Sequence, residues 1–118
     1  MAKAGLFLGW GMPIPGREQK AVQLFQEVMQ FYGRLQQQGE IESFEPILLE
    51  PHGGDLGGFV LLRGDAEKIA RLRISAEFNS YTQRAQLLLM DVGIVGAIYG
   101  EELQQSMAEF GGHLAALG

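Results

Sequence analysis

The 118-residue chain contains no cysteine. Disulfide bonds, thiol catalysis and thiolate metal ligands are therefore excluded. The two histidines, His52 and His113, do not stand at a spacing typical of a metal site. The polar residues suggest no Ser-His-Asp arrangement and no pair of catalytic carboxylates. We therefore expect no metal and no cofactor, and the sequence identifies no catalytic residue.

Basic residues are few and scattered. The chain has 9 Lys and Arg against 14 Asp and Glu, for a formal net charge of −5. Its densest basic spot is Arg71 with Arg73, whereas nucleic-acid binding and polybasic membrane contacts both need a larger cluster. No apolar run approaches the ~18 residues of a membrane span, and the run at 6–8 is too short for a secretory signal. We expect a cytoplasmic protein with no nucleic-acid and no membrane partner.

Hydrophobic residues make up 47% of the chain, which fits one globular domain over residues 1–118. Apolar residues at three- and four-residue spacing predict a long helix over 17–38. Clusters of Gly and Pro separate shorter apolar runs that are typical of strands. The expected strands are 4–12, 43–50, 57–63 and 92–99. The expected helices are 17–38, then 65–89 as one bent or two consecutive helices, then 101–110, which Gly111 and Gly112 interrupt.

The resulting order, β-α-β-β-α-β-α, predicts an α+β domain. The Gly-rich turn at 51–55 joins the second and third strands in a hairpin. Right-handed crossovers place the helices of the two βαβ units on one face of the sheet. This is the ferredoxin-like split βαβ arrangement, with a four-stranded antiparallel sheet and a C-terminal helix. Pro46 marks its strand as an edge strand or the site of a bulge.

Both faces of the predicted sheet are apolar. On the first strand Leu6 and Leu8 point one way and Phe7 the other, and the third and fourth strands follow the same pattern. An antiparallel sheet with one wet face alternates apolar and polar residues, and a second exposed apolar face is unusual on a monomer. We therefore predict a homodimer that packs sheet to sheet and closes an α/β barrel by two-fold symmetry. The alternative cover is a C-terminal helix that folds back over this face.

Two segments resemble known families within the dimeric α/β-barrel superfamily, which the element order resembles over about residues 4–99. The stretch 65–81 is similar to the helix–kink–helix element of antibiotic-biosynthesis-monooxygenase-like domains, with Ser75, Phe78 and Tyr81 at its kink. The stretch 39–64 resembles the YciI-related proteins, with a helix end, a strand, a Gly/Asp turn and a glycine-led strand.

The first resemblance implies a polar pocket that works without metal or cofactor, and it names no catalytic residue. The YciI-related proteins are associated with a His–Asp pair near the first helix and before the second. No histidine stands near the first helix of this chain, and residues 75–77 replace the usual Asp-Pro step. That pair is therefore not carried over.

Four aromatic residues are predicted to line one pocket between sheet and helices. Trp10 lies near the end of the first strand, Tyr32 on the long helix, and Phe78 and Tyr81 on the second helical region. Tyr and Trp carry polar groups that orient a ligand inside an apolar pocket. Arg63, at the end of the third strand, is a candidate for binding a carboxylate through its planar guanidinium. The aromatic residues equally fit an ordinary core, and Arg63 equally fits a structural ion pair.

Two further features allow both a chemical and a structural interpretation. His52 stands in the Gly-rich turn between Glu50 and Asp55, as a candidate general base or as an exposed turn residue. The Gly9-x-Gly11 pattern fits a structural turn, or a helix N-terminus at which Arg17 holds an anion.

The sequence therefore supports two functions. The first is a small-molecule-binding protein or cofactor-independent enzyme that acts on a small apolar or aromatic substrate between sheet and helices. The second is a non-catalytic dimeric interaction or structural module. Fold analogy favours the first, and whether the chain is an enzyme stays open.

Overall fold

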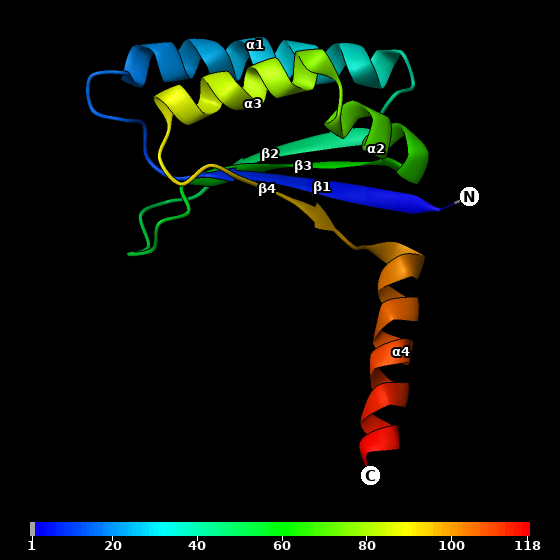
Figure 1. Cartoon of the computed structure of the whole chain (residues 1–118). Helices are drawn as coiled ribbons and strands as arrows, with labels where there is room; N and C mark the ends of the chain where they lie inside the picture. Colours follow the sequence, from blue (N-terminus) through cyan, green and yellow to red (C-terminus); the bar gives the residue numbers. More distant parts are fainter. Residues whose placement is uncertain (1) are drawn as a thin grey trace.

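Strands and helices follow one another in the predicted order in the computed structural model, which describes residues 2–118 (Figure 1). Met1, the first residue of the predicted domain, lies outside the described residues. The second helical region is divided into two helices. The strands are β1 (Lys3–Trp10), β2 (Ser43–Leu48), β3 (Gly58–Asp65) and β4 (Gly93–Ala97). The helices are α1 (Glu18–Gln37), α2 (Ala66–Arg73), α3 (Ala76–Leu88) and α4 (Gly100–Leu117).

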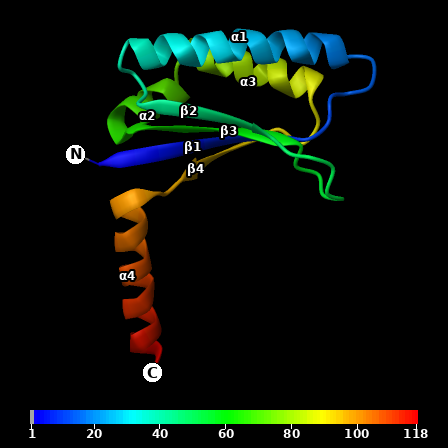
Figure 2. The ribbon, with the colours of Figure 1, turned by 180° about the vertical axis from the view of Figure 1, so that it is seen from behind.

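The strands form one open antiparallel sheet in the order β2-β3-β1-β4. β2 is an edge strand, as Pro46 predicts, because proline cannot donate a hydrogen bond to a second neighbour. Helices α1, α2 and α3 cover one face of the sheet, and the other face is left uncovered (Figures 1 and 2). The ferredoxin-like α+β fold is therefore confirmed, and the sheet of one chain is not a closed barrel.

Side-chain caps divide the second helical region. The Asp65 carboxylate accepts a hydrogen bond from the Lys68 N–H at 3.2 Å and so begins α2. The Ser75 hydroxyl donates to the Leu72 carbonyl at 2.7 Å and accepts from the Phe78 N–H at 3.3 Å. One serine therefore ends α2 and begins α3, because its oxygen satisfies an orphan group of each helix.

The core lies between the covered face of the sheet and helices α1 to α3. Successive side chains of a strand point to opposite faces, and the register places Leu6 opposite Leu62 on the covered face. Both leucines are fully buried, and Phe31 of α1 is buried with them. Apolar packing of this kind is the main source of stability in a domain of this size.

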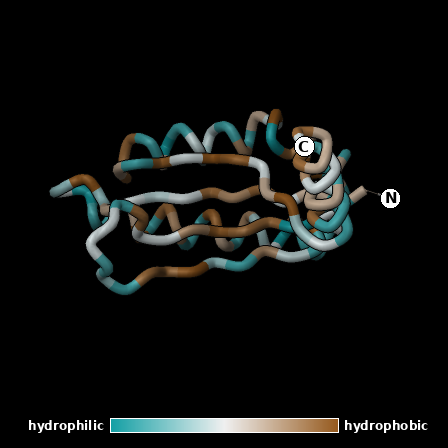
Figure 3. Tube along the Cα trace, turned by 90° about the horizontal axis from the view of Figure 1, so that it is seen from below, coloured by the Kyte–Doolittle hydropathy of each residue, from teal (hydrophilic) through white to brown (hydrophobic). Residues whose placement is uncertain are grey.

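The uncovered face, here called the open face, is apolar as predicted. Phe7 of β1 and Phe59 of β3 stack on it, with ring centroids 5.0 Å apart and an interplanar angle of 28°. Leu61 and Val95 lie opposite Phe7 on its two neighbouring strands. Figure 3 views this face from below and shows hydrophobic segments along the strands.

One expectation about the C-terminal helix is wrong, and the alternative cover for the open face is not observed. The helix does not stop at Gly111 and Gly112 but continues to Leu117. A helical glycine costs about 1 kcal/mol relative to alanine, and the leucines and alanines that follow are strong helix formers. α4 also does not fold back over the open face, but projects away from the sheet on that side (Figures 1 and 2). Across residues 2–118, every helix is either too short or too polar to span a bilayer.

Candidate ligand-binding cavity

A cavity of about 850 Å³ lies between the sheet and helices α1 and α3. It opens at the end of the domain where β1 ends, α1 begins and the loop between β2 and β3 leaves the sheet. Its lining is almost entirely apolar. The predicted pocket residues Trp10, Tyr32, Phe78 and Tyr81 all contribute to the lining.

Aromatic contacts hold these side chains in place. Trp10 meets Phe25 of α1 edge to face, with ring centroids 6.0 Å apart. Tyr81 of α3 packs on Phe31 of α1, with ring centroids 4.9 Å apart. Tyr32 packs on Phe44 of β2, with ring centroids 5.9 Å apart. Such pairs contribute roughly 0.5–1.5 kcal/mol each beyond their buried area. Three of the four predicted pocket residues, Trp10, Tyr32 and Tyr81, therefore belong to an aromatic frame around the cavity.

Tyr32 supplies a polar group to this frame. Its side chain is only 2% exposed, and burial raises the pKa of its hydroxyl above the ordinary value for tyrosine. The hydroxyl is therefore neutral and can both donate and accept a hydrogen bond at physiological pH. Among residues 2–118 it has no hydrogen-bond partner. Within residues 2–118 the buried side-chain polar atom without a partner is the Tyr99 hydroxyl. The Tyr32 oxygen therefore keeps some access to solvent, and it is free to bond a polar ligand atom.

Two other polar side chains of the lining, Thr82 and His52, are already hydrogen-bonded to the backbone. The Thr82 hydroxyl donates to the Phe78 carbonyl at 3.1 Å. His52 Nδ1 accepts a hydrogen bond from the Gly54 N–H at 3.2 Å, so Nε2 carries the ring hydrogen and donates to the Leu56 carbonyl at 2.7 Å. His52 therefore shapes the β2–β3 loop, and in this conformation neither ring nitrogen is open to a substrate.

Two ion pairs tie α1 to α3 on the outer side of the cavity. Arg84 donates two hydrogen bonds to the Glu27 carboxylate, at 2.7 and 3.1 Å, and Arg34 donates to Glu77 at 2.8 Å. The hydrogen bonds from Arg84 lower the pKa of Glu27, and the Glu27 carboxylate raises the pKa of Arg84. Both pairs are exposed, so their contribution to stability is small and falls with salt.

The lowered pKa of Glu27 predicts how the stability of the protein depends on pH. Because the folded state lowers its pKa, the pair stabilises the protein above the ordinary carboxyl pKa, and this stabilisation is lost as the pH falls through the folded-state value. Glu27→Gln is expected to lower the Tm slightly at pH 7 and to leave it unchanged at pH 3. Thermal unfolding followed by circular dichroism at both pH values, with Glu109→Gln on the exposed surface as control, checks this. An equal Tm loss at both pH values would show that the charge of Glu27 plays no part.

Arg63 does not line the cavity. It follows Phe59 and Leu61 in the alternation of β3 and therefore lies on the open face. There its guanidinium donates to Glu45 at 3.2 Å and stands 5.7 Å from the ring centroid of Tyr99. The Tyr99 hydroxyl is itself buried and has no partner within residues 2–118. The structure therefore separates Arg63 from the other four predicted residues.

The structure adds lining residues that sequence reasoning missed. Phe25 and Val28 of α1 and Ala85 and Leu89 at the end of α3 extend the walls. Their helical spacing from Tyr32 and Tyr81 was visible in the sequence and could have identified them. Residues 48–57 form the rim, which only the fold of the loop reveals. Residues 2–118 contain no group of His, Asp and Glu side chains arranged to hold a metal ion.

The turn after β1 is structural rather than an evident anion site. The Gly11 N–H donates to the Met90 carbonyl at 2.7 Å, and the Arg17 guanidinium donates to the Leu87 carbonyl. A Cβ at Gly11 would stand 2.9 Å from the Asp55 carbonyl oxygen, so the glycine permits a close approach of two chain segments.

Comparison with known proteins identifies the fold. No family model matches the chain, and no curated protein is similar to it in sequence. A dimeric protein of unknown function and ferredoxin-like fold from Bacteroides fragilis superposes with a TM-score of 0.61 at 7% identity, over 82% of this chain and 96% of that chain. SnoaB, a cofactor-independent oxygenase from Streptomyces nogalater, superposes with a TM-score of 0.56 at 14% identity, over 85% and 96%. A mutant of the same oxygenase superposes with a TM-score of 0.58 at 13% identity, over 86% of this chain and 98% of that chain.

Identities this low establish a common fold and nothing finer. The resemblance to monooxygenase-like domains is confirmed at that level, and the resemblance to the YciI-related proteins stays a prediction. The chain has the ferredoxin-like fold of a dimeric protein and of a cofactor-independent oxygenase.

Proposed function

We propose that this protein binds a small apolar or aromatic molecule in the cavity, either as a binding protein or as an enzyme that needs no cofactor. One observation carries the proposal: an apolar cavity of about 850 Å³ whose lining includes Tyr32, a residue whose hydroxyl forms no hydrogen bond within residues 2–118. The cofactor-independent oxygenase among the structural neighbours supports the enzymatic form of the proposal.

The size of the cavity fits such a ligand. Pockets for small molecules typically span roughly 300–1,000 Å³ and combine an apolar lining with a few polar groups. Protein interiors otherwise pack at the density of organic crystals. A flat aromatic molecule that fills a space of this size gains many dispersion contacts with its walls.

The chain provides its own reporter for a binding test. Trp10 is the single tryptophan and lies in the cavity wall. Titration with 1-naphthol, and with naphthalene as its counterpart without a hydroxyl, should quench Trp10 fluorescence in a saturable way. Calorimetry then gives both affinities. Absence of saturable binding across such a probe panel would contradict the proposal.

Tyr32→Phe is expected to separate the two probes. Loss of one hydrogen bond costs about 1 kcal/mol, so the affinity for 1-naphthol should fall about fivefold. The affinity for naphthalene should stay unchanged, because the ring of residue 32 is kept. Tyr99→Phe is the matched control, since Tyr99 lies on the other side of the sheet. Equal losses for both probes would show that the variant disturbs the cavity rather than a hydrogen bond.

A second candidate function is a non-catalytic dimeric module. The apolar open face favours a homodimer with either function, and the structural neighbour from Bacteroides fragilis is dimeric. We extend the proposal to a homodimer that buries this face. A dimer that binds neither probe nor any co-purified molecule in native mass spectrometry would favour the module.

The cytoplasmic location stays a prediction.

A further inference from the structure

α4 carries an apolar stripe that its own domain does not cover. The stripe residues recur at helical spacing, and all are exposed by 45–85%. They are Leu103, Met107, Phe110, Leu114 and Leu117. α4 has no buried residue, and its first turn is held by the hydrogen bond from the Lys3 N–H to Glu102. An isolated helix of this length is marginal in water, so a partner surface is needed to stabilise it.

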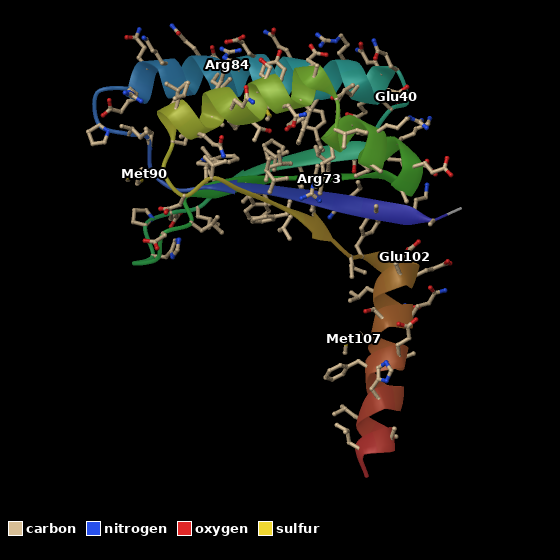
Figure 4. The ribbon with its side chains drawn as sticks, viewed as in Figure 1. Glu40, Arg73, Arg84, Met90, Glu102 and Met107 are labelled. Carbon is tan, nitrogen blue, oxygen red and sulfur yellow. The ribbon has the colours of Figure 1, made fainter. Side chains whose placement is uncertain are left out.

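The stripe and the open face form two walls of one concave apolar surface. α4 stands nearly upright at one end of the sheet, on the side of the open face (Figures 1 and 2). Met107 points from the helix into the space beneath the sheet (Figure 4). An L-shaped surface of this kind is filled by a second copy turned about a two-fold axis, since each sheet then covers the other.

The length of α4 takes it past the partner's sheet. Its 18 residues span about 27 Å at 1.5 Å per residue. Two sheets that pack face to face lie only about 10 Å apart. The second half of α4, which includes Phe110 and Leu114, must therefore run along the flank of the partner's sheet and helix layers.

One flank of the domain matches that stripe in chemistry. Six exposed apolar residues gather at the end where the cavity opens, here called the cavity end; they are Met12, Val22, Leu48, Leu49, Leu87 and Met90. The Met90 N–H donates to the Met12 carbonyl, and Arg17 at the start of α1 donates to the Leu87 carbonyl, so these segments lie together. The opposite end exposes Ile74 next to Arg71 and Arg73.

We propose that the apolar stripe of α4 packs against the cavity end of a second copy, so that each cavity is closed by the partner's helix. This inference rests on the dimer of the proposed function and goes beyond it, because it makes the binding site a product of two chains. The two-fold axis then lies between the sheets and roughly perpendicular to the strands, which brings the α4 of each copy to the other copy's cavity end.

Cysteine cross-linking tests the contact directly, because the chain has no thiol of its own. An isotope-labelled Leu114→Cys chain is mixed with an unlabelled Met90→Cys chain, oxidised and analysed by peptide mass spectrometry. A parallel mixture replaces Met90→Cys with Ile74→Cys at the opposite end. The product that joins positions 114 and 90 should exceed the 114–74 product at least tenfold, since a disulfide needs Cβ atoms roughly 4 Å apart.

A second arm tests closure of the cavity. Phe110→Glu on the stripe should weaken 1-naphthol binding at least fivefold, roughly the loss expected when an apolar wall is replaced by a solvated charge. Gln105→Glu, on the other side of α4, should bind like the parent chain.

The outcomes separate this inference from the function on which it rests. Sedimentation that shows only monomers would overturn both the dimer and the shared cavity. A dimer that binds 1-naphthol, but links position 114 to position 74 or only to itself, would overturn the α4 contact alone. Unchanged binding in Phe110→Glu would likewise show that the partner's helix does not close the cavity.

Discussion

Val95→Asp is expected to turn the proposed dimer into monomers while leaving the fold of each chain intact. Val95 lies on β4, opposite Phe7 on the open face, and is 56% exposed in the single chain. In a monomer the new carboxylate stays in water and costs little. In a dimer closed through this face it would be buried without a partner, at a cost of several kcal/mol. The dissociation constant should therefore rise about 1,000-fold.

Analytical ultracentrifugation over a range of concentrations measures this effect. Gln23→Asp is the matched control, because it adds the same charge on the exposed surface of α1, away from the open face. The thermal unfolding of the parent chain should also depend on its concentration, since association stabilises the folded state by mass action, whereas that of Val95→Asp should not. Unchanged association in Val95→Asp would place the dimer interface elsewhere, and a monomeric parent chain would remove it.

Local patterns were enough to predict the order of the elements. The 3.6-residue period of α1 and the Gly and Pro punctuation around the strands act over a few residues, and the structure follows them. Pro46 correctly marked an edge strand, because its missing N–H excludes a second neighbour. The break at Ser75 was also visible, and its two hydrogen bonds explain why the chain divides there.

The candidate site was harder to predict, because both faces of the sheet are apolar. Alternation within each strand places Trp10 on the same face as Leu6, and Arg63 on the same face as Leu61. The register that puts Leu6 opposite Leu62 is not visible in the sequence when both faces are apolar, so Arg63 could not be separated from the aromatic residues. The volume of the cavity depends on how far α1 and α3 stand from the sheet, which is a property of tertiary packing and not of any local signal.

The course of α4 could not be predicted from the sequence. Gly111 and Gly112 weaken the local helix preference, yet the helix continues through both. Its stripe of leucines and Phe110 is suited to an apolar surface, and the packing of such a stripe contributes more than propensity does. A pattern of this kind predicts that a helix is amphipathic, but not which surface it meets.

Ala85→Trp is expected to abolish binding of 1-naphthol without destabilising the protein. Ala85 lies on α3, one helical turn from Tyr81, and its side chain contributes to the cavity wall. An indole at this position would occupy part of the space of about 850 Å³ that a ligand needs. The affinity for 1-naphthol should fall at least thirtyfold, because the ligand would overlap the indole and small shifts of a close-packed wall cannot relieve that overlap. The added contacts offset the lower helix propensity of Trp, which is about 0.5 kcal/mol below that of alanine.

Calorimetry is the measurement of choice, because a second tryptophan would confuse the fluorescence of Trp10. Gln83→Trp on the exposed side of the same helix adds the same side chain outside the cavity, and it should bind 1-naphthol like the parent chain. Circular dichroism and the Tm of both variants establish that each is folded. If Ala85→Trp keeps its affinity and its fold, the ligand does not occupy the space between α1, α3 and the sheet. The open face and α4 would then be the functional surface, and the interaction module would become the better description of this protein.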